Sequence, residues 1–148
     1  MFAAGRRLGV FALSGIASVA VVARGASAPP ERIERGRYLV ERASMCIDCH
    51  TPMDAKGMPD RAKWMQGSPI LFKPTVKVPA WADTAPSLAG LVGYTDVQIV
   101  RALQAGVGPT GNPLRPPMPA FRFSKEDAEA IVAFLRTLKP APVAGPKR

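Results

Sequence analysis

Five consecutive residues hold the groups in this sequence that are best suited to chemistry. Cys46, Cys49 and His50 form a C-x-x-C-H run. Two thiols at this spacing can each bond one vinyl group of a haem as a thioether, and the adjacent imidazole can then ligate the iron. The chain has only two cysteines and one histidine, and all three lie in this run. The motif therefore predicts one covalently attached haem c.

Cysteine pairs also occur in three other kinds of site. A thioredoxin-like redox dithiol needs a βαβ context, and no alternating β-branched run stands near Cys46. A zinc site usually has four protein ligands, and the sequence has no second Cys/His pair. A disulfide between Cys46 and Cys49 would be small and strained, and it would leave His50 without a role. The redox dithiol and the disulfide stay open as alternatives to haem attachment.

The ligand on the distal side of the iron decides what such a haem can do. Composition excludes a second histidine. Met45, Met53, Met58 and Met65 lie too near the motif in sequence to cross the haem ring easily, whereas Met118 lies far beyond it between two prolines that restrain the backbone. We predict His50 and Met118 as the iron ligands. The alternative is that Met118 only fills the core.

Histidine and methionine ligation predicts an electron carrier. A thioether ligand raises the reduction potential and fills the position that oxygen or peroxide would need. The chain is therefore expected to transfer single electrons, without being an enzyme. Two other classes of function stay open. One is a haem peroxidase or gas sensor with a labile Met118, and the other is a cytochrome that mainly serves as a structural or docking subunit.

Residues 1–28 predict a signal peptide or an N-terminal anchor. Basic residues precede an apolar run over 8–22, and an A-x-A pattern ends at Ala28. The run is shorter than the ~20 residues of a spanning helix, which favours cleavage. Pro29 directly after Ala28 disfavours a cut there, so an earlier cut or an uncleaved anchor stays open. We predict a periplasmic protein, either released or associated with the membrane through this segment.

The positive charge of the chain suggests what kind of partner it meets. The formal charge is +9, and leaving out the three arginines of the leader lowers it to +6. Such a field suits an acidic redox protein, although general solubility explains most of these side chains equally well. Nucleic acid is disfavoured because no basic helix face appears. The candidate docking cations are Lys56, Lys63, Lys73, Lys77, Arg115 and Arg122.

Three helices are predicted, over residues 31–43, 95–105 and 124–138. Gly36 in the middle of the first helix suggests the close approach of another helix. Thr95 and Gln98 form a capping box at the start of the second. The expected buried stripes are Ile33, Gly36, Val40 and Ala43; Val97, Val100, Ala102 and Leu103; and Ala128, Ile131, Leu135 and Leu138, with Ala130 and Phe134 beside the last.

Glycine and proline interrupt the rest of the chain. Residues 51–86 predict a long loop, with a weak hairpin of 70–72 against 76–78. Its expected apolar anchors are Trp64, Ile70, Leu71, Phe72 and Trp81. Residues 106–119 exclude a helix or a central strand. The chain is thus expected to hold one domain over 29–140 and a flexible basic tail over 141–148.

From about Ile33 to Leu138 the chain resembles the monohaem class I cytochromes c. The motifs that match are Gly36-Arg37-Tyr38-Leu39, the C-x-x-C-H run, Thr84-Ala85-Pro86-Ser87-Leu88-Ala89-Gly90, Met118 and Ile131-Val132-Ala133-Phe134-Leu135. The resemblance implies an all-α fold, with three to five helices wrapped around one covalently bound haem. It also implies that Gly36 packs on Phe134, that the Pro86 carbonyl accepts a hydrogen bond from His50, that Leu88 lines the haem, and that Met118 is the distal ligand.

A narrower resemblance concerns the haem domains of bacterial membrane dehydrogenase cytochrome subunits. It is carried by Cys49-His50-Thr51-Pro52, Arg101-Ala102-Leu103, Gly111-Asn112-Pro113-Leu114 and Met118-Pro119. Those subunits serve gluconate, alcohol and aldehyde dehydrogenases in respiratory chains. The resemblance implies redox protein partners, namely a dehydrogenase as donor and an oxidase or another cytochrome as acceptor. It leaves a second role open, as the haem subunit of a membrane dehydrogenase complex.

Overall fold

The computed structural model describes residue 1 and residues 27–142. The predicted leader therefore lies almost wholly outside the described residues, and so do residues 143–148 of the predicted tail. Among the described residues, no helix has both the length and the apolar character needed to cross a membrane.

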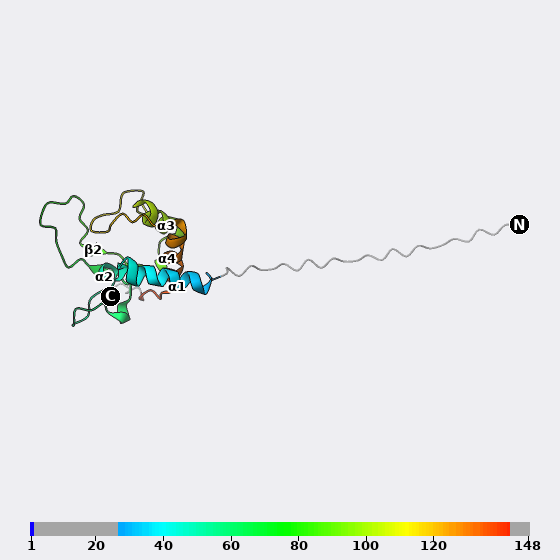
Figure 1. Ribbon diagram of the computed structural model, residues 1–148, viewed down its shortest axis with the longest axis horizontal. Coiled ribbons are helices and arrows are strands. Elements are labelled where there is room, and N and C mark those ends of the chain that lie inside the picture. The colour runs from blue at the N-terminus through cyan, green and yellow to red at the C-terminus, as the bar shows by residue number, and fades with distance from the viewer. Residues whose placement is uncertain (2–26, 143–148) are drawn as a thin grey trace, which may run out of the picture.

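Three α-helices form the framework of the domain (Figure 1). They are α1 (Pro30–Tyr38), α3 (Asp96–Ala105) and α4 (Lys125–Thr137), and α4 packs against both of the others. A short fourth helix, α2 (Cys46–His50), carries the C-x-x-C-H run. Two strands of two residues each, β1 (Ser68–Pro69) and β2 (Thr84–Ala85), pair antiparallel within the loops. The predicted fold, mostly helical with three to five helices, is confirmed.

Gly36 allows α1 and α4 to pack unusually close together. A Cβ atom added at Gly36 would lie 1.9 Å from the carbonyl oxygen of Ala130 and 2.9 Å from the Cβ of Phe134. No side chain fits in that space, so glycine is required by packing rather than by its backbone angles. The expected contact between Gly36 and Phe134 is therefore present.

The first predicted helix changes its winding before it reaches the C-x-x-C-H run. Residues Leu39–Ala43 form a π-helix, in which the Ser44 amide donates to the Leu39 carbonyl at 2.9 Å. This wider turn rotates the following side chains relative to an α-helix. Leu39 and Val40 are buried, whereas Ala43, which was expected in the buried stripe, is exposed.

The capping box predicted for α3 is present. The Thr95 hydroxyl accepts from the Gln98 amide at 3.2 Å, and the Gln98 side chain accepts from the Thr95 amide at 2.9 Å. Gly106 ends the helix in the left-handed conformation with φ +67°. The expected burial of Val97 is wrong, because its side chain is 77% exposed. The buried face of α3 consists of Ile99, Ala102 and Leu103.

The long loop differs from its sequence-based prediction. Instead of 70–72 pairing with 76–78, the strands lie at the base of the loop, where Ser68 stands opposite Ala85. The prolines at 74 and 79 have no amide proton for a strand ladder, which explains why pairing does not extend to the tip. Leu71 and Phe72, expected as buried anchors, are 73% and 53% exposed.

Arg136 of α4 forms hydrogen bonds with the turn that precedes α3. Its guanidinium donates to the carbonyls of Gly90 at 2.8 Å and Tyr94 at 2.7 Å, and to the Asp96 carboxylate at 2.9 Å. We expect Arg136→Gln to lower the free energy of unfolding by about 1–2 kcal/mol, because several charge-assisted bonds are lost from a partly exposed site. Denaturant titration measures this. Arg32→Gln is the control, because it removes a single contact of 3.8 Å with Glu129 and should have less than half of that effect. Equal losses of stability in the two variants would contradict the role given to Arg136.

Candidate functional site

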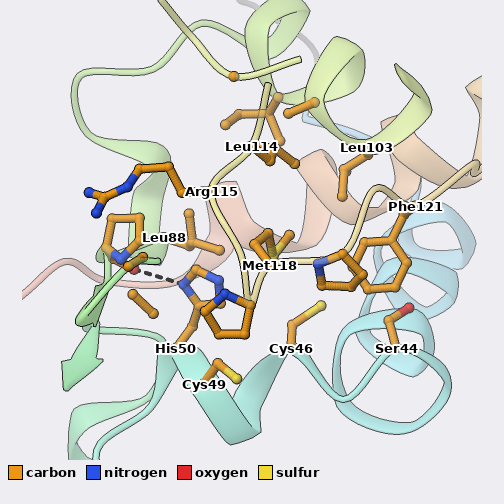
Figure 2. Close-up of a pocket in the computed structure, with 18 of the residues that line it drawn as sticks. Ser44, Cys46, Cys49, His50, Leu88, Leu103, Leu114, Arg115, Met118 and Phe121 are labelled. Atoms are coloured by element: carbon orange, nitrogen blue, oxygen red, sulfur yellow. Dashed lines mark hydrogen bonds between the residues drawn. The ribbon is translucent and has the colours of Figure 1, made fainter. Parts of the chain in front are cut away.

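A cavity of about 480 Å³ lies between α2, α3, α4 and the segment of residues 106–121. This volume is within the range of roughly 300–1,000 Å³ that is usual for cofactor and ligand sites. Most of the side chains that line it are apolar, among them Val40, Leu88, Ile99, Leu103, Leu114 and Phe121. Figure 2 shows side chains from these separate segments facing one another across the space.

One wall of the cavity consists of the C-x-x-C-H run, with Cys46, Cys49 and His50 all lining it (Figure 2). His50 is only 5% exposed, and its Nδ1 lies 2.8 Å from the Pro86 carbonyl oxygen. A carbonyl can only accept, so Nδ1 carries the proton and Nε2 keeps its lone pair for a metal. Burial lowers the pKa of His50, and the bond to Pro86 offsets this in part. The imidazole is therefore in the neutral form that binds iron.

The two cysteines are half-buried. Burial raises the pKa of Cys46 to about 11, and burial, with a smaller effect of Asp48, raises that of Cys49. Redox-active dithiols instead have a lowered thiol pKa beside positive charge. No disulfide joins Cys46 to Cys49. This environment gives no support to the redox-dithiol alternative.

Met118 enters the same cavity from a different part of the chain (Figure 2). Its amide donates to the Arg115 carbonyl at 3.1 Å within the segment, and the Ala82 amide donates to the Pro116 carbonyl at 2.7 Å, which ties the segment to the end of the long loop. Pro86 and Leu88 also line the cavity. The six residues that the sequence singled out for the cofactor thus meet around one space: Cys46, Cys49, His50, Pro86, Leu88 and Met118.

Met45 also lines the cavity, and so does Met65, which sequence position alone excludes as too close to the motif. Met65 is fully buried, and the Thr51 hydroxyl contacts its sulfur at 3.8 Å and accepts from its amide at 3.0 Å. Its carbonyl accepts from the amides of Leu88 and Ala89 at 2.8 and 3.1 Å. Met65 therefore joins the residue after His50 to the segment that carries Pro86, and so helps to position the histidine.

Two aromatic residues of the cavity were not predicted. Tyr94 precedes the cap of α3, and Phe121 lies just before α4, where it stacks on Phe123 with ring centroids 5.0 Å apart. Neither residue belongs to a periodic stripe, so no helical pattern marks it. The position of Phe121 between the Pro-rich segment and α4 was the only signal in the sequence.

The residues of the cavity fit a covalently attached haem. The space has a cofactor's volume and an apolar lining, its wall presents two thiols beside a neutral imidazole, and a thioether enters from elsewhere. A zinc centre fits less well. Among the residues with described positions, no three His, Cys, Asp or Glu side chains come together in a way that could hold a metal.

Comparison with known proteins points the same way. Residues 33–139 match the family model described as cytochrome c. The chain is also similar to a protein of Cereibacter sphaeroides named "Diheme cytochrome c-type", with 30% identity over 121 residues. That alignment covers 78% of this chain but only 38% of the relative. The chain thus spans less than half of the relative's length, and it carries one C-x-x-C-H motif.

Proposed function

The chain belongs to the cytochrome c family, with one haem c motif, and on that premise we propose that it is a periplasmic electron carrier. It would transfer single electrons from a dehydrogenase to a respiratory acceptor. The observation that supports this best is the meeting of His50 and Met118, from separate segments, in the apolar cavity that also receives the two thiols. A thioether in the distal position leaves no place for a substrate, which favours a carrier over an enzyme.

The chain's own residues would do the following. Cys46 and Cys49 attach the haem as thioethers, and His50 and Met118 ligate its iron. Bound in this way, haem c supplies a one-electron iron couple. The Pro86 carbonyl fixes the His50 ring through Nδ1, and Leu88 with its apolar neighbours excludes water. A dry, fixed environment changes little when the charge of the iron changes, which keeps electron transfer fast.

Some of the candidate docking cations already bind other groups of the protein, and others do not. Lys63 lies 3.4 Å from Asp60, and Lys73 pairs with Asp83, whose pKa it lowers. Arg115 binds two backbone carbonyls. The remaining three, Lys56, Lys77 and Arg122, make no ion pair with another described residue. Charge attraction alone is therefore a weaker basis for docking than the sequence suggests.

The loop between β1 and β2 offers an apolar surface beside the cavity. Leu71, Phe72 and Val76 are all more than half exposed, whereas Ile70 and Ala82 at its base line the cavity. In Figure 1 this loop projects from the body of the domain near β2. We therefore include its tip, together with Lys77, in the proposed docking face for a redox protein.

Electron self-exchange tests this docking face, because a second copy of the chain then stands in for the redox partner. We expect Leu71→Ser/Val76→Ser to slow exchange between oxidised and reduced copies by about tenfold, because each encounter loses apolar contacts of the loop. Line broadening in NMR spectra measures the rate. Val92→Ser/Val97→Ser, which alters two valines that are 64% and 77% exposed on other elements, is the matched control. Equal effects of the two double variants on the exchange rate would show that the loop is not part of the docking face.

The proposed function as a whole is tested on the exported protein. Mass spectrometry should show one haem adduct, and it will also report whether residues 1–28 are cleaved and where. The oxidised protein should show the weak far-red absorption band of an iron–thioether bond, and the reduced protein should resist carbon monoxide. Absence of the band together with ready binding of carbon monoxide would instead support the gas-sensor or peroxidase alternative.

A further inference from the structure

The side chain of Gln66 holds a short segment that follows α4. Its Nε2 donates to the Lys139 carbonyl at 2.9 Å, and its Oε1 accepts from the Ala141 amide at 2.8 Å. Both ends of one carboxamide are therefore used on the backbone of a single segment. We call residues 139–141 the strap. Ala141 is also the first residue of the predicted tail, so a side chain of the long loop holds the start of that tail.

The strap also packs on the turn that carries Gly90. A Cβ atom added at Gly90 would lie 3.1 Å from the Cδ of Pro140, the middle residue of the strap. Gly90 and Gln66 each adjoin one side of the same backbone junction, because the Met65 carbonyl accepts from the Ala89 amide at 3.1 Å. The strap therefore contacts both sides of this junction.

Gly67, the neighbour of Gln66, contacts both partners of the hydrogen bond at the proximal histidine. Its amide donates to the His50 carbonyl at 2.8 Å. A Cβ atom added at Gly67 would lie 3.0 Å from the carbonyl carbon of Pro86 and 2.8 Å from the Ser87 amide nitrogen. The Pro86 carbonyl accepts from Nδ1 of His50 at 2.8 Å, the bond that the dashed line marks in Figure 2. The backbone of Gly67 is therefore packed directly against this carbonyl.

A hydrogen bond at Nδ1 makes an imidazole a stronger ligand, and its strength depends on where the acceptor lies. Gly67 has no side chain with which to hold its own position. We propose that Gln66 and the strap position the proximal ligand, because they hold Gly67 against Pro86 and so keep the Pro86 carbonyl on Nδ1 of His50. This inference rests on the proposed function. It extends that function to two segments that act on the iron only through another residue.

The single histidine of the chain makes a specific test possible. In the reduced, untagged holoprotein, labelling histidine with ¹⁵N gives one ring N–H signal, that of Nδ1 of His50. The rate at which this signal is lost in D₂O measures how often the hydrogen bond to Pro86 opens. We expect Gln66→Ala to speed this exchange by about tenfold, since both bonds to the strap are lost. Gln66 is only half-buried, so the variant should fold.

Ala141→Pro tests the strap while Gln66 stays intact. Proline has no amide proton, so only the bond of 2.8 Å is lost, and we expect exchange to be about threefold faster. Gln98→Ala is the matched control, because this glutamine also makes two side-chain bonds to backbone, with Thr95 at 2.9 Å and Pro109 at 3.3 Å, but at α3. If either Gln66→Ala or Ala141→Pro exchanges no faster than Gln98→Ala, the proposal is overturned.

The reduction potential separates positioning from a mere loss of stability. A weaker hydrogen bond leaves His50 a poorer donor to ferric iron, so we expect the potential to rise in Gln66→Ala and, by less, in Ala141→Pro. It should stay unchanged in Gln98→Ala. A fall, no change, or an equal rise in the control would overturn the proposal.

The haem adduct and the far-red band do not depend on the strap, so both should be present in every variant. If the wild type shows both and the variants show neither faster exchange nor a higher potential, the proposal fails while the proposed function stands. If the wild type lacks both, the proposed function itself fails.

Discussion

Replacing Met118 with alanine is expected to remove the far-red band of the oxidised protein and to open the iron to carbon monoxide in the reduced state. No second histidine exists in the chain, so no other imidazole can take the distal position. Losing the thioether also removes the ligand that favours ferrous iron. The reduction potential should therefore fall by on the order of 0.1–0.2 V. Absorption spectra, carbon monoxide titration and potentiometry measure the three effects on one sample.

Met65→Leu is the appropriate control, because Met65 is a fully buried methionine on the wall of the same cavity, whereas Met118 is half-buried. Its sulfur already contacts the Thr51 hydroxyl at 3.8 Å, and leucine has a similar volume. We expect the band to persist in this variant with little change in potential. If the band were lost in Met65→Leu and kept in Met118→Ala, the distal ligand would be Met65 and the assignment to Met118 would be wrong.

The chemistry of the site was predictable from sequence because most of it is local. Cys46, Cys49 and His50 lie within one helical turn, so their spacing alone specifies how they meet a cofactor. Met118 was found by elimination among six methionines, which only a chain with a single histidine permits. Pro86 came from the family resemblance, since nothing in its own neighbourhood shows that its carbonyl lies 2.8 Å from the histidine.

The remaining features depend on contacts between segments that have no periodicity. The pairing of Arg115 with the backbone at Ala80 and Trp81 joins residues about 35 positions apart through two proline-rich loops. The π-helical turn before the motif has no local signal, because no residue in Leu39–Ala43 is a helix breaker. Leu71 and Phe72 look like core residues in a linear pattern, and only the position of the short strands shows that the loop carries them outward.

Gly36→Ala is expected to be the most destabilising single change outside the iron ligands. The added Cβ would lie 1.9 Å from the Ala130 carbonyl oxygen, far inside van der Waals contact, so α1 and α4 would have to separate. We expect the free energy of unfolding to fall by about 3 kcal/mol, at the upper end for overpacked positions. Denaturant titration of the holoprotein, followed by helical circular dichroism, measures this. Gly57→Ala is the control, since a Cβ there meets nothing within 4 Å and only the positive φ of +75° costs about 1 kcal/mol.

A double variant shows which contact matters at this helix crossing. Phe134→Ala would remove a side chain near Gly36, but the Phe134 Cβ at 2.9 Å and the Ala130 carbonyl at 1.9 Å would remain. We therefore expect Phe134→Ala not to rescue Gly36→Ala, because the closest obstacle is backbone of α4, which cannot change its rotamer. Rescue would mean that the helices meet through side chains instead. Since α1 leads through the π-helix directly to Cys46, displacing it should also reduce the yield of haem-loaded protein, which connects the packing of two helices to the assembly of the site.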